Sequence, residues 1–151
     1  MKPPQHIVDF AIEASLLSPC QSKRGVAIFN GDDLVSTGFN HKPRGFFCDG
    51  SNECKSMCSR DAVHAEQAAI IGIPGPKTRG AEMLHVKTVD GNLVESMGPS
   101  CLQCSKLIIE AGITAMWLFH AAGWKRYAAG IFHRLSGAYR PPPTATQEGA
   151  E

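Results

Sequence analysis

Apolar and polar residues follow two periods along the chain, and each period predicts a different kind of element. In residues 4–17 apolar side chains recur every three or four positions, which predicts an amphipathic helix. Pro19 ends it, because proline disfavours a helical residue before it. The apolar runs 25–29 and 34–39 flank a polar turn and predict a β-hairpin.

The remaining patterns predict helices at 62–72, 101–111 and 124–136 and strands at 83–89, 93–96 and 113–119. Asp61 is expected to cap the helix at 62–72, and Gly112 closes the helix at 101–111. Residues 40–61 have no period and are rich in Gly, Ser, Asn and Cys. We therefore expect a loop of about 22 residues there, a length that usually indicates a functional or tied-down segment.

This order of helices and strands predicts one layered α/β domain over residues 1–140. Residues 141–151 are rich in Pro and Ala and are expected to form a disordered tail. No apolar run approaches the roughly 20 residues that span a bilayer, and the first residues lack the apolar stretch of a signal peptide. We expect a cytoplasmic protein without a membrane partner.

Two short motifs at predicted helix starts carry ligands for a metal ion. The first is His64-Ala65-Glu66, and the second is Cys101-Leu102-Gln103-Cys104. The imidazole and the two thiolates are three ligands for a tetrahedral zinc, which leaves the fourth position open to water. The order His-x-Glu followed by Cys-x-x-Cys is typical of zinc-dependent nucleobase deaminases. Two facing helix starts would also help to keep the thiolates ionised.

Three ligands and an open position indicate a hydrolytic zinc. Such an ion lowers the pKa of its bound water toward ~7 and gives a hydroxide nucleophile at neutral pH. Glu66 is placed to carry protons between this nucleophile, the ring nitrogen and the leaving amine. The alternative is a closed structural zinc or a pair of buried cysteines, and the carboxylate of Glu66 argues against it.

Composition supports a metal enzyme and argues against a nucleic-acid partner. The chain has six cysteines, which in a cytoplasmic protein favour metal binding over disulfides. Its formal net charge is +1, so it has no basic field that would draw it onto nucleic acid.

Longer stretches around both motifs resemble the dCMP (deoxycytidylate) deaminase branch of the zinc-dependent cytidine deaminase superfamily. These stretches are residues 63–70 and 101–113, together with 36–40 and 43–45, which resemble that branch's substrate loop. The similarity covers roughly residues 5–120. It implies a three-layer cytidine-deaminase-like fold with a central five-stranded mixed sheet flanked by helices. It also implies one catalytic zinc and a homo-oligomer with its sites near subunit contacts.

The resemblance further implies substrate contacts and a second metal. Asn40 and Ala65 are expected to contact the substrate, whereas without the resemblance Asn40 would be interpreted as a turn residue. Some dCMP deaminases carry a second, structural zinc between the end of the first helix and the long loop. Its candidate ligands here are Cys20, Cys48, Cys54 and Cys58. Four thiolates would close a tetrahedral site and order the loop. Some of these cysteines could instead be buried apolar residues, and His41 could substitute as a ligand.

A nucleotide phosphate needs a cationic or amide-rich pocket. The basic residues that flank the loops near the site are Lys23, Arg24, Lys42, Arg44 and Arg60. Lys42 and Arg44 lie beside Asn40 in the sequence and are our candidates for the phosphate contact. Each could equally be a solvated surface charge.

The chain departs from the usual pattern of this branch in three places. Ser100 separates Pro99 from Cys101 where a Pro-Cys pair is usual, a hairpin is added over 89–98, and the sequence after Phe119 differs. These departures concern the substrate more than the zinc chemistry.

The sequence therefore predicts deamination of a cytosine nucleotide, with dCMP to dUMP as the leading reaction. The alternatives are a modified pyrimidine nucleotide, a free nucleoside, a base in RNA or single-stranded DNA, and a non-catalytic zinc-stabilised binding module.

Overall fold

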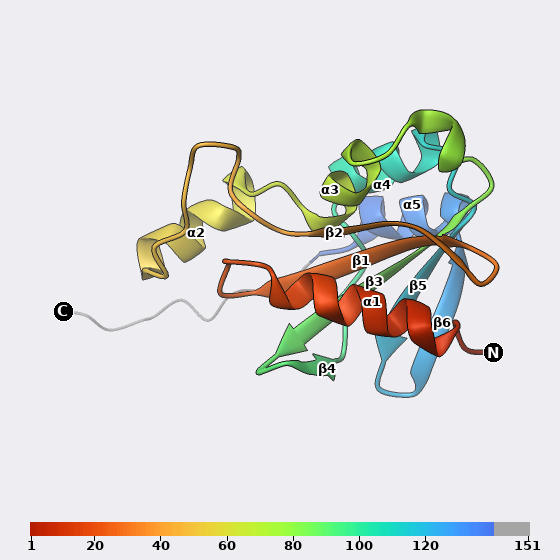
Figure 1. Ribbon diagram of the computed structural model, residues 1–151, viewed down its shortest axis with the longest axis horizontal. Helices are drawn as coiled ribbons and strands as arrows, with labels where there is room; N and C mark the ends of the chain where they lie inside the picture. Colours follow the sequence, from red (N-terminus) through yellow and green to blue (C-terminus); the bar gives the residue numbers. More distant parts are fainter. Residues whose placement is uncertain (141–151) are drawn as a thin grey trace.

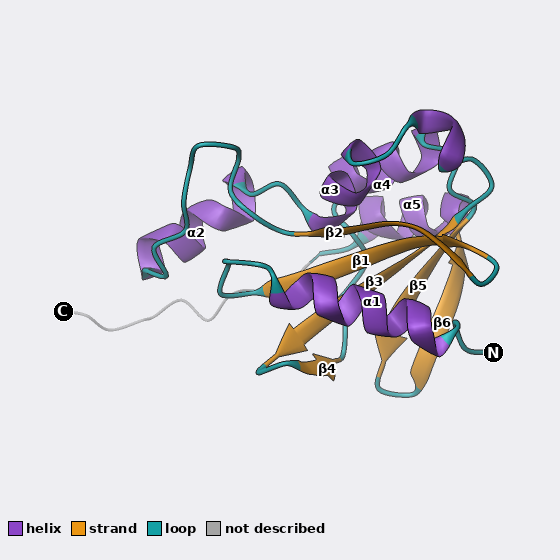
Figure 2. Cartoon of the chain, viewed as in Figure 1, coloured by secondary structure: helices purple, strands orange, loops and turns teal. Residues whose placement is uncertain are grey.

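The computed structural model describes residues 1–140, apart from the side chains of residues 58 and 59. A mixed sheet lies between two helical layers, with α1 on one face and α3, α4 and α5 on the other (Figures 1 and 2). In chain order the elements are α1 (Gln5–Leu16), β1 (Lys23–Asn30), β2 (Asp33–Phe39), α2 (Asn52–Asp61), α3 (Ala65–Ile71), a 3₁₀ turn (Gly75–Lys77), β3 (Glu82–Val89), β4 (Asn92–Val94), α4 (Leu102–Glu110), β5 (Ala115–His120), β6 (Gly123–Ala128) and α5 (Ala129–Ala138).

The strand order is β2-β1-β3-β5-β6, and β4 pairs with the C-terminal end of β3. The β3 and β5 pair is parallel, and the other pairs are antiparallel. The predicted three-layer α/β fold with a mixed sheet is confirmed, with six strands where five were expected.

The central strands are apolar on both faces because both faces are covered. Val26 and Ile28 pack in the cluster under α3, α4 and α5, whereas Ala27 and Phe29 pack in the cluster under α1. Side chains of successive strand residues point to opposite faces, so a strand between two helical layers forms a continuous apolar run.

Two glycines allow helices to lie directly against the sheet. A Cβ added to Gly38 on β2 would lie 2.5 Å from both the Ala65 carbonyl oxygen and the Ala69 nitrogen of α3. A Cβ on Gly25 of β1 would lie 2.0 Å from the Ala11 carbonyl oxygen of α1. Because glycine has no Cβ, α3 can pack directly on β2 at Gly38.

The predicted loop over 40–61 is wrong in its second half, where residues form α2. This helix is polar, so it lacks the apolar stripe on which the prediction depended. Asp61 is its last residue and not the cap of the next helix. Val63 instead pairs with His41 in an isolated bridge, and α3 begins at Ala65 with His64 as its N-cap.

The predicted helix over 124–136 is also wrong in its first half, which forms β6. Trp124 and Tyr127 are spaced like one face of a helix, but tertiary contacts decide the conformation. Trp124 packs on Phe119 across the β5–β6 hairpin, with ring centroids 5.2 Å apart. Gly123 begins β6 with a φ of 113°, which favours glycine.

The expected tail over 141–151 lies outside the described residues. Among the helices of the described part, none is both long and apolar enough to cross a membrane.

Candidate active site

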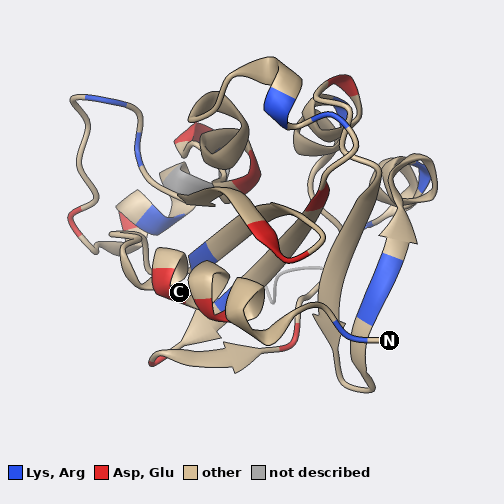
Figure 3. Cartoon of the chain, turned by 45° about the vertical axis from the view of Figure 1, so that its right-hand side comes forward, with Lys and Arg blue, Asp and Glu red and all other residues tan. Residues whose placement is uncertain are grey.

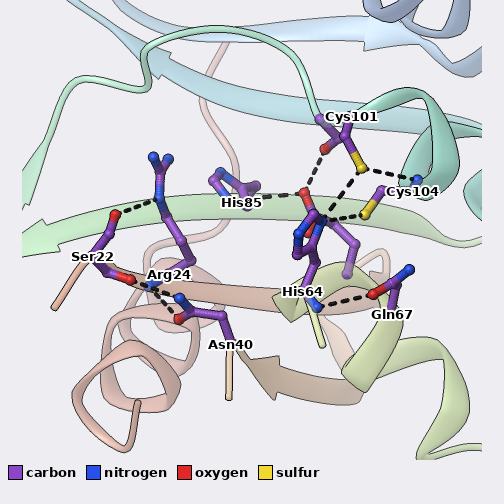
Figure 4. Close-up of polar contacts among 10 residues, drawn as sticks. Ser22, Arg24, Asn40, His64, Gln67, His85, Cys101 and Cys104 are labelled. Atoms are coloured by element: carbon purple, nitrogen blue, oxygen red, sulfur yellow. Dashed lines mark hydrogen bonds and ion pairs between the residues drawn. The ribbon is translucent and has the colours of Figure 1, made fainter. Parts of the chain in front are cut away.

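The three predicted metal ligands come together at the N-termini of two helices. His64 is the N-cap of α3, Cys101 is the N-cap of α4, and Cys104 lies in the first turn of α4. His64 Nδ1 lies 3.1 Å from Cys104 Sγ and 3.4 Å from Cys101 Sγ (Figure 4). All three ligand atoms lie within 4.8 Å of one another.

This cluster fits a zinc ion. In a tetrahedral site with usual bond lengths, a nitrogen and a sulfur ligand lie about 3.5 Å apart. The two distances from His64 Nδ1 are close to that value. One imidazole and two sulfurs are also a donor set that zinc takes in preference to harder cations.

A hydrogen bond between the two thiols shifts their pKa values in opposite directions. The hydrogen bond with Cys104 lowers the pKa of Cys101 to about 4, although burial opposes the shift. The same hydrogen bond, together with burial, raises the pKa of Cys104. A bound zinc ion would hold both sulfurs as thiolates, since thiolates are the metal-binding form.

Glu66 lies in the first turn of α3 and is only 5% exposed. Its Oε1 accepts a hydrogen bond from the Ser100 hydroxyl at 2.5 Å and lies 3.8 Å from His85 Nε2. Burial raises the pKa of the Glu66 carboxyl, but attraction to His85 and the Ser100 hydrogen bond outweigh burial and lower it. The residue that interrupts the usual Pro-Cys pair therefore holds the candidate proton carrier.

His85 on β3 belongs to the site, and sequence reasoning missed it. It is buried, and its Nδ1 has no hydrogen-bond partner among the described residues. Burial lowers the pKa of His85, and attraction to Glu66 opposes the shift. The sequence did contain one signal for His85. It is the one polar residue in the apolar run 83–86, and strand alternation places it on the same face as Met83.

A cavity of about 410 Å³ extends from the metal ligands along β1 and β3. Its lining includes His64, Glu66, His85 and Cys101, and also Arg24 and Lys55. Figure 4 shows Arg24, His85 and His64 following one another along the same side of the sheet. The cavity therefore joins the metal ligands to a basic wall.

The two expected substrate contacts, Asn40 and Ala65, both line this cavity. The amide of Asn40 already has two partners in the backbone that leads into β1. Its Oδ1 accepts from the Arg24 N–H at 2.9 Å, and its Nδ2 donates to the Ser22 carbonyl at 2.7 Å. A role of Asn40 and Ala65 in substrate binding stays a prediction.

The candidate phosphate residues Lys42 and Arg44 are not among the described residues that line the cavity. Lys42 Nζ lies 3.4 Å from Asp61 Oδ2. Arg44 is in the exposed turn that precedes Gly45. Their role in phosphate binding is untested, and the structure brings Arg24 and Lys55 to the cavity in their place.

The spare cysteines are partly brought together. The Cys54 thiol donates to Cys48 Sγ at 3.3 Å, and the Cys20 thiol donates to the Asn40 carbonyl oxygen at 3.8 Å. The side chain of Cys58 lies outside the described ones. Within the described part, His64, Cys101 and Cys104 are the group of three that could hold a metal, so the second zinc stays a prediction.

Comparison with known proteins gives matches among solved structures alone. No protein-family model and no curated protein matches the chain. A cytidine deaminase from Burkholderia pseudomallei matches with a TM-score of 0.59 and 18% identity, covering 86% of this chain and 95% of that one. A dCMP deaminase from the cyanophage S-TIM5 matches with a TM-score of 0.53 and 23% identity, covering 77% and 82%. The phage enzyme in complex with dCMP and dUMP gives a TM-score of 0.51 at 22% identity, with 77% of this chain and 82% of that chain covered.

These identities are low, so the likeness concerns the arrangement of the backbone. Both matches extend over most of this chain and most of the neighbour's chain. The chain therefore has the cytidine deaminase fold.

Proposed function

We propose that the protein is a zinc-dependent hydrolase that removes the exocyclic amine of a cytosine nucleotide as ammonia, with dCMP to dUMP as the leading reaction. The observation that carries this proposal is the position of Glu66. Glu66 is a buried carboxylate at the wall of the cavity. It lies two residues after His64, in the first turn of α3. A closed structural metal site has no use for such a carboxylate.

A zinc ion held by His64, Cys101 and Cys104 would supply the Lewis acid that activates water at neutral pH. Glu66 accepts the proton of the attacking water and gives it to the ring nitrogen of the base. It then passes the second proton to the leaving amine, so that water and the amine become a carbonyl and ammonia. Ser100 and His85 hold the carboxylate in place for both transfers.

The cytosine nucleotide is supported by the motif resemblance described above, and by the likeness to the phage enzyme solved with dCMP and dUMP. A free nucleoside is the second candidate. It is favoured by the match to the B. pseudomallei cytidine deaminase, which covers more of both chains. A modified pyrimidine nucleotide is tested together with these two.

A base within nucleic acid is less well supported. Basic and acidic residues are interspersed along the described chain in the view of Figure 3, and the formal net charge is +1. Nonspecific attraction to phosphate backbones needs a positive field that this distribution does not supply. Assembly into a homo-oligomer and a cytoplasmic location remain predictions.

The test measures ammonia release by the purified, zinc-loaded protein from dCMP, CMP, deoxycytidine, cytidine, cytosine and 5-substituted dCMP. Glu66→Gln should keep one zinc per chain and lose about 10²- to 10⁴-fold in rate, because it removes the proton carrier and no ligand. Glu110→Gln, at the exposed end of α4, is the matched control and should keep the wild-type rate.

If none of these compounds releases ammonia, the nucleotide proposal is overturned. Single-stranded DNA and RNA would then be tested as substrates. A Glu66→Gln variant that retains the wild-type rate would overturn the mechanism. Loss of zinc in that variant would place Glu66 among the ligands instead.

A further inference from the structure

Two basic residues from separate parts of the chain, Arg24 and Lys55, line the cavity, and Lys87 lies beside Arg24 in the sheet. Arg24 on β1 and Lys87 on β3 are direct partners in the antiparallel ladder. Val26 and His85 form the next pair on the same face of the sheet, because side chains two residues apart in a strand point to the same side. Lys55 of α2 reaches the same cavity as Arg24.

These three basic residues form no ion pair within 4.0 Å with an acidic residue in the described part of the chain. The ion pairs within 4.0 Å in this part of the chain are Lys42–Asp61, Arg126–Glu82 and His85–Glu66. The Arg24 guanidinium donates from Nε to the Ser22 hydroxyl at 3.3 Å. By contrast, Arg126 lies 2.5 Å from a carboxylate oxygen of Glu82. Glu66 attracts the Arg24 guanidinium from a distance. A half-buried guanidinium with no carboxylate oxygen within 4.0 Å in the described part of the chain is unusual, because burial of an unpaired charge is costly.

Lys87 is close enough to both Arg24 and Lys55 to be repelled by them. Burial lowers the pKa of Arg24, and Glu66 opposes the shift. Burial, Arg24 and Lys55 together lower the pKa of Lys87. An anion bound between these groups would remove the repulsion and supply the missing acceptors.

We propose that Arg24, assisted by Lys55 and Lys87, binds the phosphate of a nucleotide substrate whose base lies at His64 and Glu66. The inference rests on the proposed function for the position of the base, and it specifies a phosphorylated substrate over a free nucleoside. A guanidinium offers paired N–H donors that match two phosphate oxygens.

The backbone around Arg24 is prepared for such a contact. The Asn40 amide binds the Arg24 N–H and the Ser22 carbonyl, and the Ser22 hydroxyl accepts from Nε. These bonds fix the start of β1 and orient the guanidinium. The predicted alternative, Lys42 with Arg44, has no residue among those that line the cavity.

The test is calorimetric titration of the zinc-loaded protein with dUMP, deoxyuridine and inorganic phosphate, none of which is consumed. The wild type should bind dUMP about 10- to 100-fold more tightly than deoxyuridine, the usual strength of hydrogen bonds to a charged group. Arg24→Gln should abolish this preference and leave deoxyuridine binding unchanged. Lys55→Gln should reduce the preference in part. It changes an exposed residue and keeps the test decisive if Arg24→Gln fails to fold.

Arg134→Gln, on the exposed side of α5, is the matched control and should keep the wild-type preference. Equal binding of dUMP and deoxyuridine by the wild type would overturn the proposal. So would equal weakening of both ligands by Arg24→Gln, or loss of the preference in Arg44→Gln alone. Inorganic phosphate that binds as tightly as dUMP would show a general oxyanion site and would also overturn it.

These outcomes are separate from those of the deamination assay. A protein that releases no ammonia from any compound, yet prefers dUMP through Arg24, would refute the deaminase and keep the phosphate site. A protein that deaminates dCMP and deoxycytidine with equal kcat/KM would keep the deaminase and refute the phosphate site.

Discussion

Gly38→Ala should impair the candidate metal centre from the opposite side of α3. A Cβ at this position would lie 2.5 Å from two backbone atoms of α3 and 3.0 Å from the Ala69 Cα. Backbone atoms of a helix cannot turn aside as a flexible side chain can. To reach an ordinary contact of about 3.4 Å, α3 must move away from β2 by about 0.9 Å.

That movement carries His64 with it, because His64 is the N-cap of α3. Cys101 and Cys104 belong to α4 and do not follow directly. Metal–ligand distances are held within about 0.2 Å of their usual values, so a displacement of this size weakens zinc binding. We expect a loss of about 1–3 kcal/mol in stability from overpacking. We also expect a loss of about 10²-fold in kcat/KM, as for other misplacements of about 1 Å.

The assay combines urea unfolding of the metal-free protein, competition for zinc with a chromophoric chelator, and ammonia release. Gly25→Ala is the matched control, because its Cβ would lie 2.0 Å from the Ala11 carbonyl oxygen and displace α1 instead. It should lose at least as much stability and yet keep the zinc affinity of the folded protein. If Gly38→Ala remains folded with wild-type zinc affinity and rate, close packing of α3 on β2 does not position His64.

Three further predictions follow from single contacts. Ser100→Ala removes a hydrogen bond that lowers the pKa of Glu66, so the acid limb of the kcat/KM profile should move to higher pH; an unmoved limb would contradict this. Because burial lowers the pKa of His85, its stabilising effect is present above the unfolded pKa of ~6.5 and is lost as the pH falls. His85→Gln should therefore lose less stability than the wild type between pH 7 and pH 5 in urea unfolding, and an equal loss would contradict the lowered pKa of His85. Phe132→Ala, at a position 1% exposed in the core, should cost about 3–5 kcal/mol by the same method, and a cost below 1 kcal/mol would be inconsistent with the packing.

Local patterns predicted the candidate metal ligands, which the structure brings together, and the helices that carry them. His64, Cys101 and Cys104 lie in short motifs at helix starts, and each motif is read within a few residues. The apolar periods of α1 and β1 were equally local. These features needed no knowledge of which strands pair.

The missed features depend on contacts between distant segments or on the lack of an apolar stripe. The polar helix α2 has no such stripe, and β6 shows a helix-like spacing that its pairing with β5 overrides. The Arg24–Lys87 pair and the position of His85 depend on the register of β1 against β3, whose partners are about 60 residues apart in the sequence. No local pattern sets that register.

The double use of Asn40 changes how mutants at this position must be interpreted. Its amide joins the end of β2 to the segment that holds Arg24, so the residue belongs to the scaffold as well as to the cavity wall. An Asn40→Ala change would loosen the guanidinium and remove a polar group from the cavity at once. Its effects and those of Arg24→Gln would then be non-additive, and only a double-mutant cycle could divide the loss between recognition and support.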